Sequence, residues 1–134
     1  MHDRSDGKRF VTGTQLLLYT LREAGAPLSL HDLMRTADQI ADRLRAEGFE
    51  IEVFFRSPYC GNVWSEGFER SIWYWLSNRF VEEDPKSGDL SLSESGRKLF
   101  ADRDLFKAIN RSLDEQALAE VTSVIRQAVG ARGA

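Results

Sequence analysis

The chain has 134 residues, of which 42% are hydrophobic and 29% are charged, and its formal net charge is −3. This length predicts one domain with a real hydrophobic core, and the negative charge gives no bulk signature of nucleic-acid binding. The single cysteine, Cys60, excludes an internal disulfide and is typical of a reducing cytosol.

Residues 1–11 are predicted to form a flexible arm ahead of a domain that spans residues 12–100. The segment Met1 to Lys8 is polar and charged, unlike a secretory signal peptide. No apolar run approaches the ~20 residues that span a bilayer. We therefore expect a cytoplasmic protein without a membrane segment. Arg4, Lys8 and Arg9 leave a minor-groove DNA arm open as the alternative to a frayed terminus.

The first helix is predicted to begin near Thr12 or Thr14 and to carry a thick apolar face. Gly25 ends it, because glycine adopts the left-handed conformation of a helix C-terminus, and Pro27 cannot continue the helix. This helix should supply much of the core.

A second helix is predicted from Ser29, which caps it, with Asp32 at the position that completes a capping box. Apolar residues keep helical spacing until Gly48. Because the helix is long, a break near Thr36 would give a helix-turn-helix within residues 30–47.

Residues 49–54 alternate between apolar and polar, with Phe49, Ile51 and Val53 on one face. Such alternation predicts a half-buried strand. We expect it to pair with a hairpin later in the chain. The following residues, Arg56 to Val63, are rich in turn formers and are expected to form a loop.

A third helix begins after Ser65, a good N-cap. One apolar stripe is expected in the core and consists of Phe68, Ile72, Trp75 and Leu76. Trp73 and Tyr74 lie off that stripe, beside Arg70. Either another element covers the two aromatic rings or they contact a partner, since aromatics and arginine are enriched at interfaces.

A β-hairpin follows, because residues 84–89 are turn formers and Leu90 to Leu92 alternate as a strand does. The segment from Glu82 to Asp89 holds four acids and one lysine, so it carries a net charge of −3. Ser93 then restarts a helix.

This order of helix, hairpin and closing strand resembles winged helix-turn-helix proteins, among them the MarR and PadR type regulators. The segment Leu92-Ser93-Glu94-Ser95-Gly96-Arg97 is similar to the L-T-x-x-G-R closure of their wing, with Ser93 in place of threonine. Ser57-Pro58-Tyr59 is similar to a G-P-Y-S helix entry, with Ser57 in place of glycine. The resemblance covers roughly residues 12–100. It implies a mostly α fold with a small antiparallel hairpin (α+β), extended by C-terminal helices.

Residues 101–130 form that helical extension. Ser112 and Glu115 suggest a capping box. Leu118, Val121 and Ile125 recur at helical spacing, and a terminal amphipathic helix is a frequent dimerisation device in the regulators that the chain resembles. We expect these three residues at a homodimer interface. The alternative is that the helix packs back on its own domain.

The sequence offers no catalytic motif, no metal-ligand spacing and no cofactor signature. His2 lies in the arm, His31 opens the second helix, and Cys60 has no adjacent base. We therefore expect a non-enzymatic protein without metal or cofactor.

Two functions remain open. The resemblance implies a DNA-binding transcriptional regulator; the acidic hairpin favours a protein–protein interaction adaptor within a larger bacterial complex, since phosphate contacts dominate DNA affinity. The sequence favours DNA by a small margin. In both cases the expected binding residues, for duplex DNA or for a protein partner, are Arg56, Arg70, Trp73, Tyr74, Ser77 and Lys98.

Overall fold

A computed structural model describes residues 8–59 and 62–133 of the chain. The residues of the N-terminal arm before Lys8, with His2, and the pair Cys60 and Gly61 lie outside the described residues. The fold is mostly helical with three small strand pairs, as the α+β prediction expects. The helices are α1 (Gly13–Ala24), α2 (Leu30–Ala46), α3 (Glu66–Ser77), α4 (Glu94–Leu99), α5 (Arg103–Ile109) and α6 (Glu115–Gly133). The strands are β1 (Phe10–Val11), β2 (Glu50–Ile51), β3 (Arg56–Tyr59), β4 (Asn62–Trp64), β5 (Val81–Glu83) and β6 (Leu90–Leu92).

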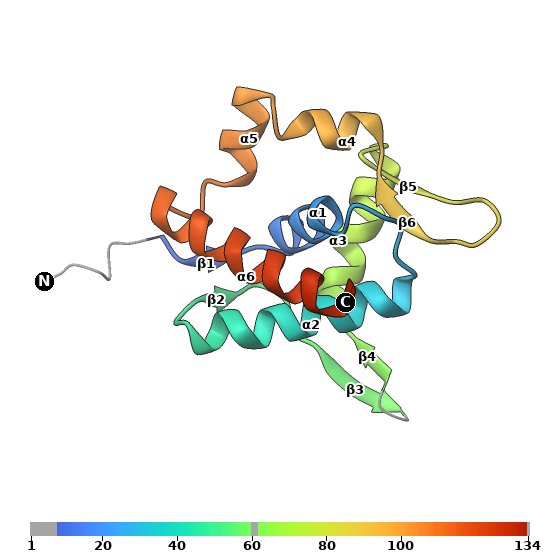
Figure 1. The fold of residues 1–134 in the computed structure, drawn as a ribbon, viewed down its shortest axis with the longest axis horizontal. Coiled ribbons are helices and arrows are strands. Elements are labelled where there is room, and N and C mark those ends of the chain that lie inside the picture. The colour runs from blue at the N-terminus through green and yellow to red at the C-terminus, as the bar shows by residue number, and fades with distance from the viewer. Residues whose placement is uncertain (1–7, 60–61, 134) are drawn as a thin grey trace, which may run out of the picture.

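Helix α1 lies at the centre of the molecule (Figure 1). Thr12 caps it in a capping box with Gln15, and Gly25 closes it with φ 64°, so both predicted ends are confirmed. Four consecutive residues from Leu16 to Tyr19 are at most 1% exposed. A helix buried on every side must be surrounded, and α2, α3, α6 and β6 all contact it.

Helix α2 runs without a break from Leu30 to Ala46, which excludes the break near Thr36 that the sequence left open. The Ser29 hydroxyl accepts a hydrogen bond from the Asp32 backbone N–H, as predicted. Thr36 is buried and lies in the middle of the helix, whose apolar stripe continues through it. Nothing in the sequence interrupts that stripe, and packing therefore favours one continuous helix.

The predicted strand at residues 49–54 is shorter than expected and has another partner. Phe49, Ile51 and Val53 are buried, which confirms the predicted face. However, only Glu50–Ile51 is a strand, and it pairs in parallel with Phe10–Val11. The last residues of the expected flexible arm are therefore built into the fold.

Leu28, between α1 and α2, takes the place that this strand was expected to fill beside the later hairpin. Its backbone N–H donates to the Leu90 carbonyl at 2.9 Å, and the Leu90 N–H donates back at 2.7 Å. The hairpin β5–β6 itself is confirmed, with Val81 opposite Leu92. A connecting residue thus ties the hairpin to the junction of the first two helices.

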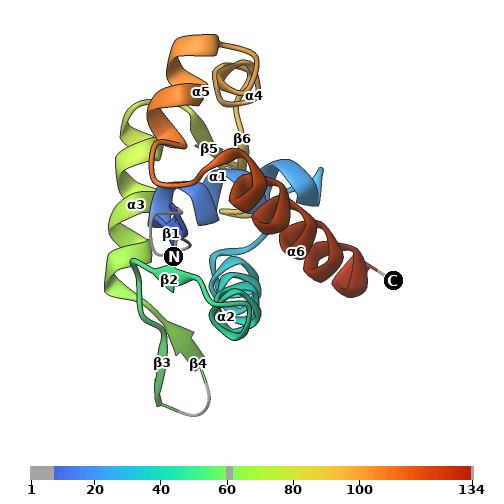
Figure 2. The ribbon, with the colours of Figure 1, turned by 90° about the vertical axis from the view of Figure 1, so that its left-hand side faces the viewer.

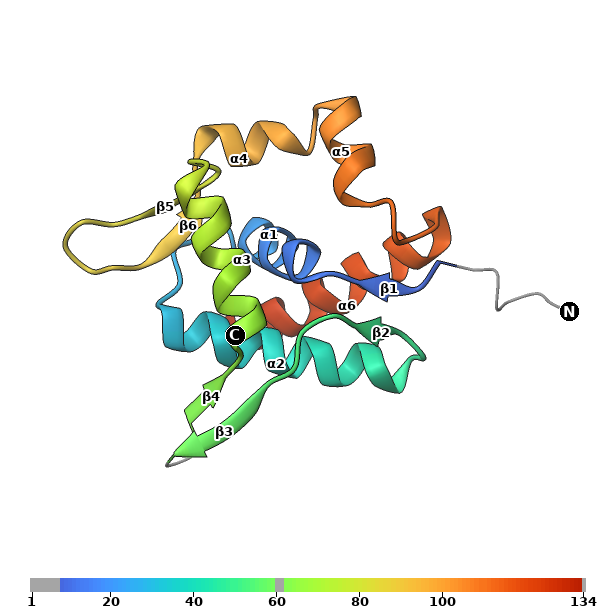
Figure 3. The ribbon, with the colours of Figure 1, turned by 180° about the vertical axis from the view of Figure 1, so that it is seen from behind.

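A second hairpin, β3–β4, replaces the loop expected before α3. Arg56 lies opposite Trp64, and the pairing is irregular beyond them. In Figure 3, β3–β4 and β5–β6 lie at opposite ends of α3. The third helix therefore presents its outer side between two hairpins.

Helix α6 packs across α1 and α2 instead of extending away from the domain (Figure 2). Val121 and Ile125 have no exposed surface within the single chain. The first turn of α6 is capped by Asp114, whose carboxylate accepts from the Ala117 N–H at 2.8 Å. The predicted Ser112 cap is wrong because the Ser112 hydroxyl instead accepts from the Gln15 side chain at 3.0 Å.

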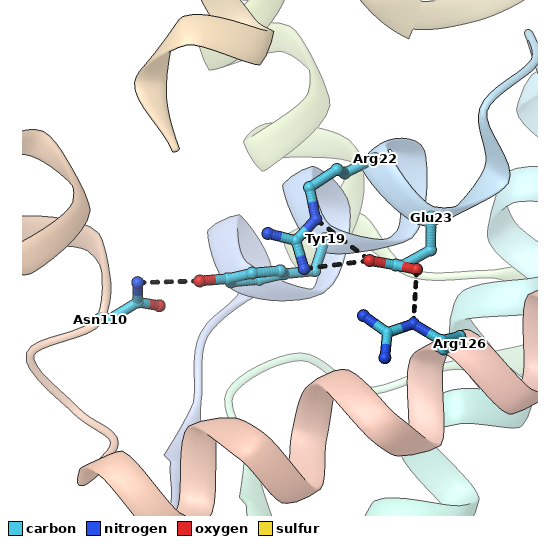
Figure 4. A network of polar contacts seen from close by, with 5 residues as sticks. All are labelled: Tyr19, Arg22, Glu23, Asn110 and Arg126. Carbon is cyan, nitrogen blue, oxygen red and sulfur yellow. Dashed lines mark hydrogen bonds and ion pairs between the residues drawn. The ribbon is translucent and has the colours of Figure 1, made fainter. Parts of the chain in front are cut away.

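Polar side chains of α1 fasten the C-terminal helices (Figure 4). The Asn110 amide donates to the Tyr19 hydroxyl at 2.9 Å. Glu23 forms ion pairs with Arg22 and with Arg126 of α6, both at 3.0 Å. Burial raises the pKa of Glu23, but the hydrogen bond from Arg126 and the charge of Arg22 outweigh it, so that its pKa is lowered. This network fixes α6 to the end of α1.

Candidate interaction surface on helix α3

The inner side of α3 sits unusually close to its neighbours. Ser65 caps the helix as predicted, and its hydroxyl accepts from the Phe68 N–H at 3.1 Å. A Cβ on Gly67 would lie 3.1 Å from the Val53 side chain, and one on Gly13 would lie 2.5 Å from the Ser71 hydroxyl. Glycine at these two positions lets α1, α3 and the segment after β2 approach closely, which fixes the orientation of the outer side of α3.

The expected apolar stripe of α3 is buried in its first half only. Phe68 and Ile72 are 0% and 2% exposed, whereas Trp75 and Leu76 are half-buried. The Trp75 indole N–H donates to the Thr14 hydroxyl at 2.9 Å. The second half of the helix lies nearer the edge of the molecule, so full burial of all four side chains was wrong.

Trp73 and Tyr74 are exposed on the outer side of α3, at 56% and 59%. No described element covers them, so the first of the two sequence interpretations is excluded for the described chain. Phe54, after β2, is 75% exposed. We call the set around these rings the α3 surface, and it consists of Phe54, Arg56, Trp64, Glu69, Arg70, Trp73, Tyr74 and Ser77.

Glu69 holds two tryptophans of this surface in place. One carboxylate oxygen accepts from the indole N–H of Trp64, on β4, and the other accepts from the indole N–H of Trp73, each at 3.3 Å. One carboxylate therefore connects the β3–β4 hairpin to α3. It also limits the rotamers of both indoles, so that their rings are ordered before any partner arrives.

Two adjoining hollows run along the start of α3, with volumes of about 280 and 340 Å³. Both are lined by Glu52, Val53, Gly67 and Arg70. Tyr74 lines the first hollow, while Arg56 and Trp64 line the second. They give the α3 surface a concave flank beside its exposed rings.

The charged groups along these hollows differ in whether they have a partner among the described residues. Glu52 accepts from the Gly13 N–H at 2.7 Å and so stabilises the start of α1. Arg56 and Arg70 make no ion pair with any described residue. Their guanidinium groups are therefore available to a ligand or partner.

Phe54 is exposed, but Arg45 holds its ring in place. The Arg45 guanidinium lies over its ring at 5.5 Å and donates to the Val53 carbonyl at 3.0 Å. Arg45 therefore supports the chain at this point through both a cation–π contact and a hydrogen bond.

The structure brings five of the six predicted binding residues together and separates the sixth. Arg70, Trp73, Tyr74 and Ser77 share the outer side of α3, and Arg56 lines the adjacent hollow. Lys98 lies on α4, forms an ion pair with Glu94 at 3.2 Å, and lines neither hollow.

The three predicted dimer residues do not form one exposed face. Val121 and Ile125 are buried against the protein's own core, which is the alternative that the sequence left open. Only Leu118 is partly exposed. While this packing holds, Val121 and Ile125 cannot contact a second copy.

Sequence reasoning missed Phe54, Trp64 and Glu69 as members of the surface. Phe54 had a usable signal, because strand alternation places it on the side of Glu50 and Glu52, opposite the buried residues. The Glu69–Trp73 pair was also visible, since residues four apart on a helix are neighbours. The Trp64 contact depends on the hairpin and has no local signal.

Within the described residues, no group of histidine, cysteine and carboxylate side chains is arranged to hold a metal ion. Nor does any described helix combine the length and the apolar character needed to cross a bilayer. Comparisons of this chain with protein-family models, with curated proteins and with solved structures gave no match.

Proposed function

We propose that the chain is a winged-helix module that binds another protein through the α3 surface. The winged-helix part of the proposal is supported by the order of elements. Helices α1, α2 and α3 are followed by the β5–β6 hairpin, and Leu28 pairs with that hairpin between the first two helices. In this arrangement α3 is the helix whose outer side is presented beside the wing.

The exposed aromatic rings are the reason for proposing a protein as the partner. Trp73, Tyr74 and Phe54 are all more than half exposed, and Trp73 is already held by Glu69. Tryptophan, tyrosine and arginine dominate the energetics of protein interfaces. Pre-ordered rings bind with a smaller loss of conformational entropy than mobile ones.

Site-specific photo-crosslinking tests this proposal. Benzoylphenylalanine replaces Trp73 in the full chain, and the crosslinking is carried out in the cells that make the protein. It should give one discrete adduct with a protein. The same residue in place of Lys107, which is exposed on α5, is the matched control and should not give that adduct. An adduct with nucleic acid, or identical products from both positions, would overturn the proposal.

DNA binding is the second candidate, and the free arginines favour it. Arg56 and Arg70 line neighbouring hollows on the same surface without ion-pair partners in the described chain. Against it, the nearby hairpin segment from Glu82 to Asp89 has a net charge of −3 and would repel phosphates.

Fluorescence anisotropy with a random duplex at low salt tests the second candidate. Binding that falls steeply with salt, and that Arg70→Ala weakens more than Arg111→Ala, would support DNA. The absence of binding at low salt, where the electrostatic contribution is largest, would eliminate it.

A further inference from the structure

We infer that the partner presents a basic segment, with a lysine or arginine side chain placed against the Trp73 indole beside the Glu69 carboxylate. The inference rests on the proposed protein-binding function and adds the chemistry of the partner. It is carried by the geometry around Glu69 and by the charge of the two elements that flank α3.

The Glu69 carboxylate has unused acceptor capacity. A carboxylate offers about four lone-pair positions, and the two indole N–H groups take one on each oxygen. A cation can therefore share this carboxylate while it lies over an indole ring. Tryptophan is the best aromatic partner for a lysine or arginine cation, so both parts of such a site are present here.

The charge of the surrounding surface has the sign that a basic segment needs. The segment from Glu52 to Asp89, which contains α3 and the hairpins at its two ends, holds seven carboxylates and four cations, a net charge of −3; they are Glu52, Glu66, Glu69, Glu82, Glu83, Asp84 and Asp89, against Arg56, Arg70, Arg79 and Lys86.

The carboxylates of the β5–β6 hairpin differ from those that ion pairs hold in other parts of the described chain. Glu82 and Glu83 are exposed and form no ion pair with described residues. Glu23, Glu94 and Glu120, by contrast, each have an arginine or lysine partner. The hairpin therefore keeps its negative charge for a partner that supplies the missing cations.

The two arginines restrict where such a segment can lie. Arg70 and Tyr74 line the first hollow, and Trp64 lines the second hollow with Arg56 and Arg70, whereas Glu69 and Trp73 line neither. The pair that lines the first hollow and the pair that lines neither form parallel rows along α3, because residues four apart share a face. A basic segment is repelled by the arginine row and attracted by the Glu69 row, which fixes its position across the helix.

The indole resonances of the ¹⁵N-labelled full chain provide a direct readout, and the probe is a hexalysine peptide. Hexalysine should shift the Nε1–H resonances of Trp64 and Trp73. The Trp75 resonance should stay, because that indole N–H donates to the Thr14 hydroxyl and not to Glu69. Glu69→Gln should weaken the fitted affinity at least about fivefold, as the loss of a charge beside a bound cation predicts.

Glu94→Gln is the matched control, since it removes the same charge from an exposed carboxylate on α4. It should leave the affinity within about twofold, as expected for a distant surface charge. Equal losses in both variants, no indole shift, or a shift caused by hexaglutamate in place of hexalysine would each overturn the inference.

The outcomes separate this inference from the proposed function. A failure of hexalysine together with a discrete protein crosslink from position 73 overturns only the basic-segment inference. A crosslink to nucleic acid overturns the proposed function, whatever the peptide does.

Discussion

At the scale of single residues, two glycines show how local geometry decides the effect of the same substitution. A Cβ on Gly96 would overlap the carbonyl oxygen of Phe80, which is backbone and cannot rotate away. A Cβ on Gly130, within α6, would meet nothing within 4 Å. The glycine of the hairpin-closing segment is therefore required by packing, whereas that of the last helix is not.

We expect Gly96→Ala to lower the free energy of unfolding by about 3 kcal/mol, the upper part of the range for overpacking. Gly130→Ala should raise it by about 0.5–1 kcal/mol, because alanine loses less backbone entropy in a helix. Urea denaturation of both variants checks the prediction. A neutral Gly96→Ala would show that the hairpin is not held against α4 as described.

The Glu23 network predicts a pH dependence of stability. The pKa of the Glu23 carboxyl group is lowered from the ordinary 4.5 in the folded protein. The folded state therefore binds a proton at Glu23 less readily than the unfolded state. The stabilisation is therefore complete above about pH 4.5 and is lost as pH falls through the lower folded pKa.

We expect Glu23→Gln to cost on the order of 1 kcal/mol at pH 7, since it removes charge-assisted hydrogen bonds. The difference from wild type should shrink as pH falls below 4.5, the ordinary pKa. Denaturant titrations of both proteins at several pH values measure this. A difference independent of pH would mean that Glu23 does not act through its charge.

At the scale of elements, the ends of helices were predictable because their signals are local. Thr12, Ser29, Ser65 and Ser93 all cap the helices that follow them, as their sequence positions indicate. The partner of a strand is not local. Nothing near Glu50–Ile51 indicates that it pairs with Phe10–Val11, about forty residues away, instead of with the hairpin.

Helix α6 was predicted as an element but not in its role. The same apolar spacing serves a dimer interface or a core helix, and the sequence alone cannot distinguish them. Burial decides the question in the structure, because Val121 and Ile125 have no exposed surface within the single chain and α6 contacts both α1 and α2. The segment before α6 is tied to α1 as well, because the buried Gln15 amide donates to the Ile109 carbonyl at 2.8 Å and to the Ser112 hydroxyl at 3.0 Å.

We therefore expect truncation after Arg111 to unfold the domain instead of releasing a stable monomer. The deletion uncovers the sides of α1 and α2 that now contact Val121 and Ile125. Circular dichroism and binding of a hydrophobic dye should show loss of cooperative unfolding and exposed apolar surface. A truncated chain with an undiminished unfolding transition would contradict the assignment of α6 to the core.

At the scale of the whole molecule, most of the candidate surface followed from the sequence. Arg70, Trp73 and Tyr74 were predictable because helical periodicity separates them from the buried Phe68 and Ile72. The contribution of Trp64 could not be located, because the expected loop is a hairpin that folds back beside α3, whereas strand alternation does place Phe54 on the side away from the buried residues. Lys98 was misplaced because α4 turns away from this surface after the hairpin.

Whether the exposed rings of α3 bind a protein is decided by the affinity of the Trp73→Ala variant for the partner that crosslinking identifies. Isothermal titration calorimetry with the purified partner should show a loss of about 2 kcal/mol or more, as for aromatic residues at the centre of interfaces, while Lys107→Ala leaves the affinity unchanged. Equal affinities of wild type and Trp73→Ala would mean that the rings of α3 do not bind the partner.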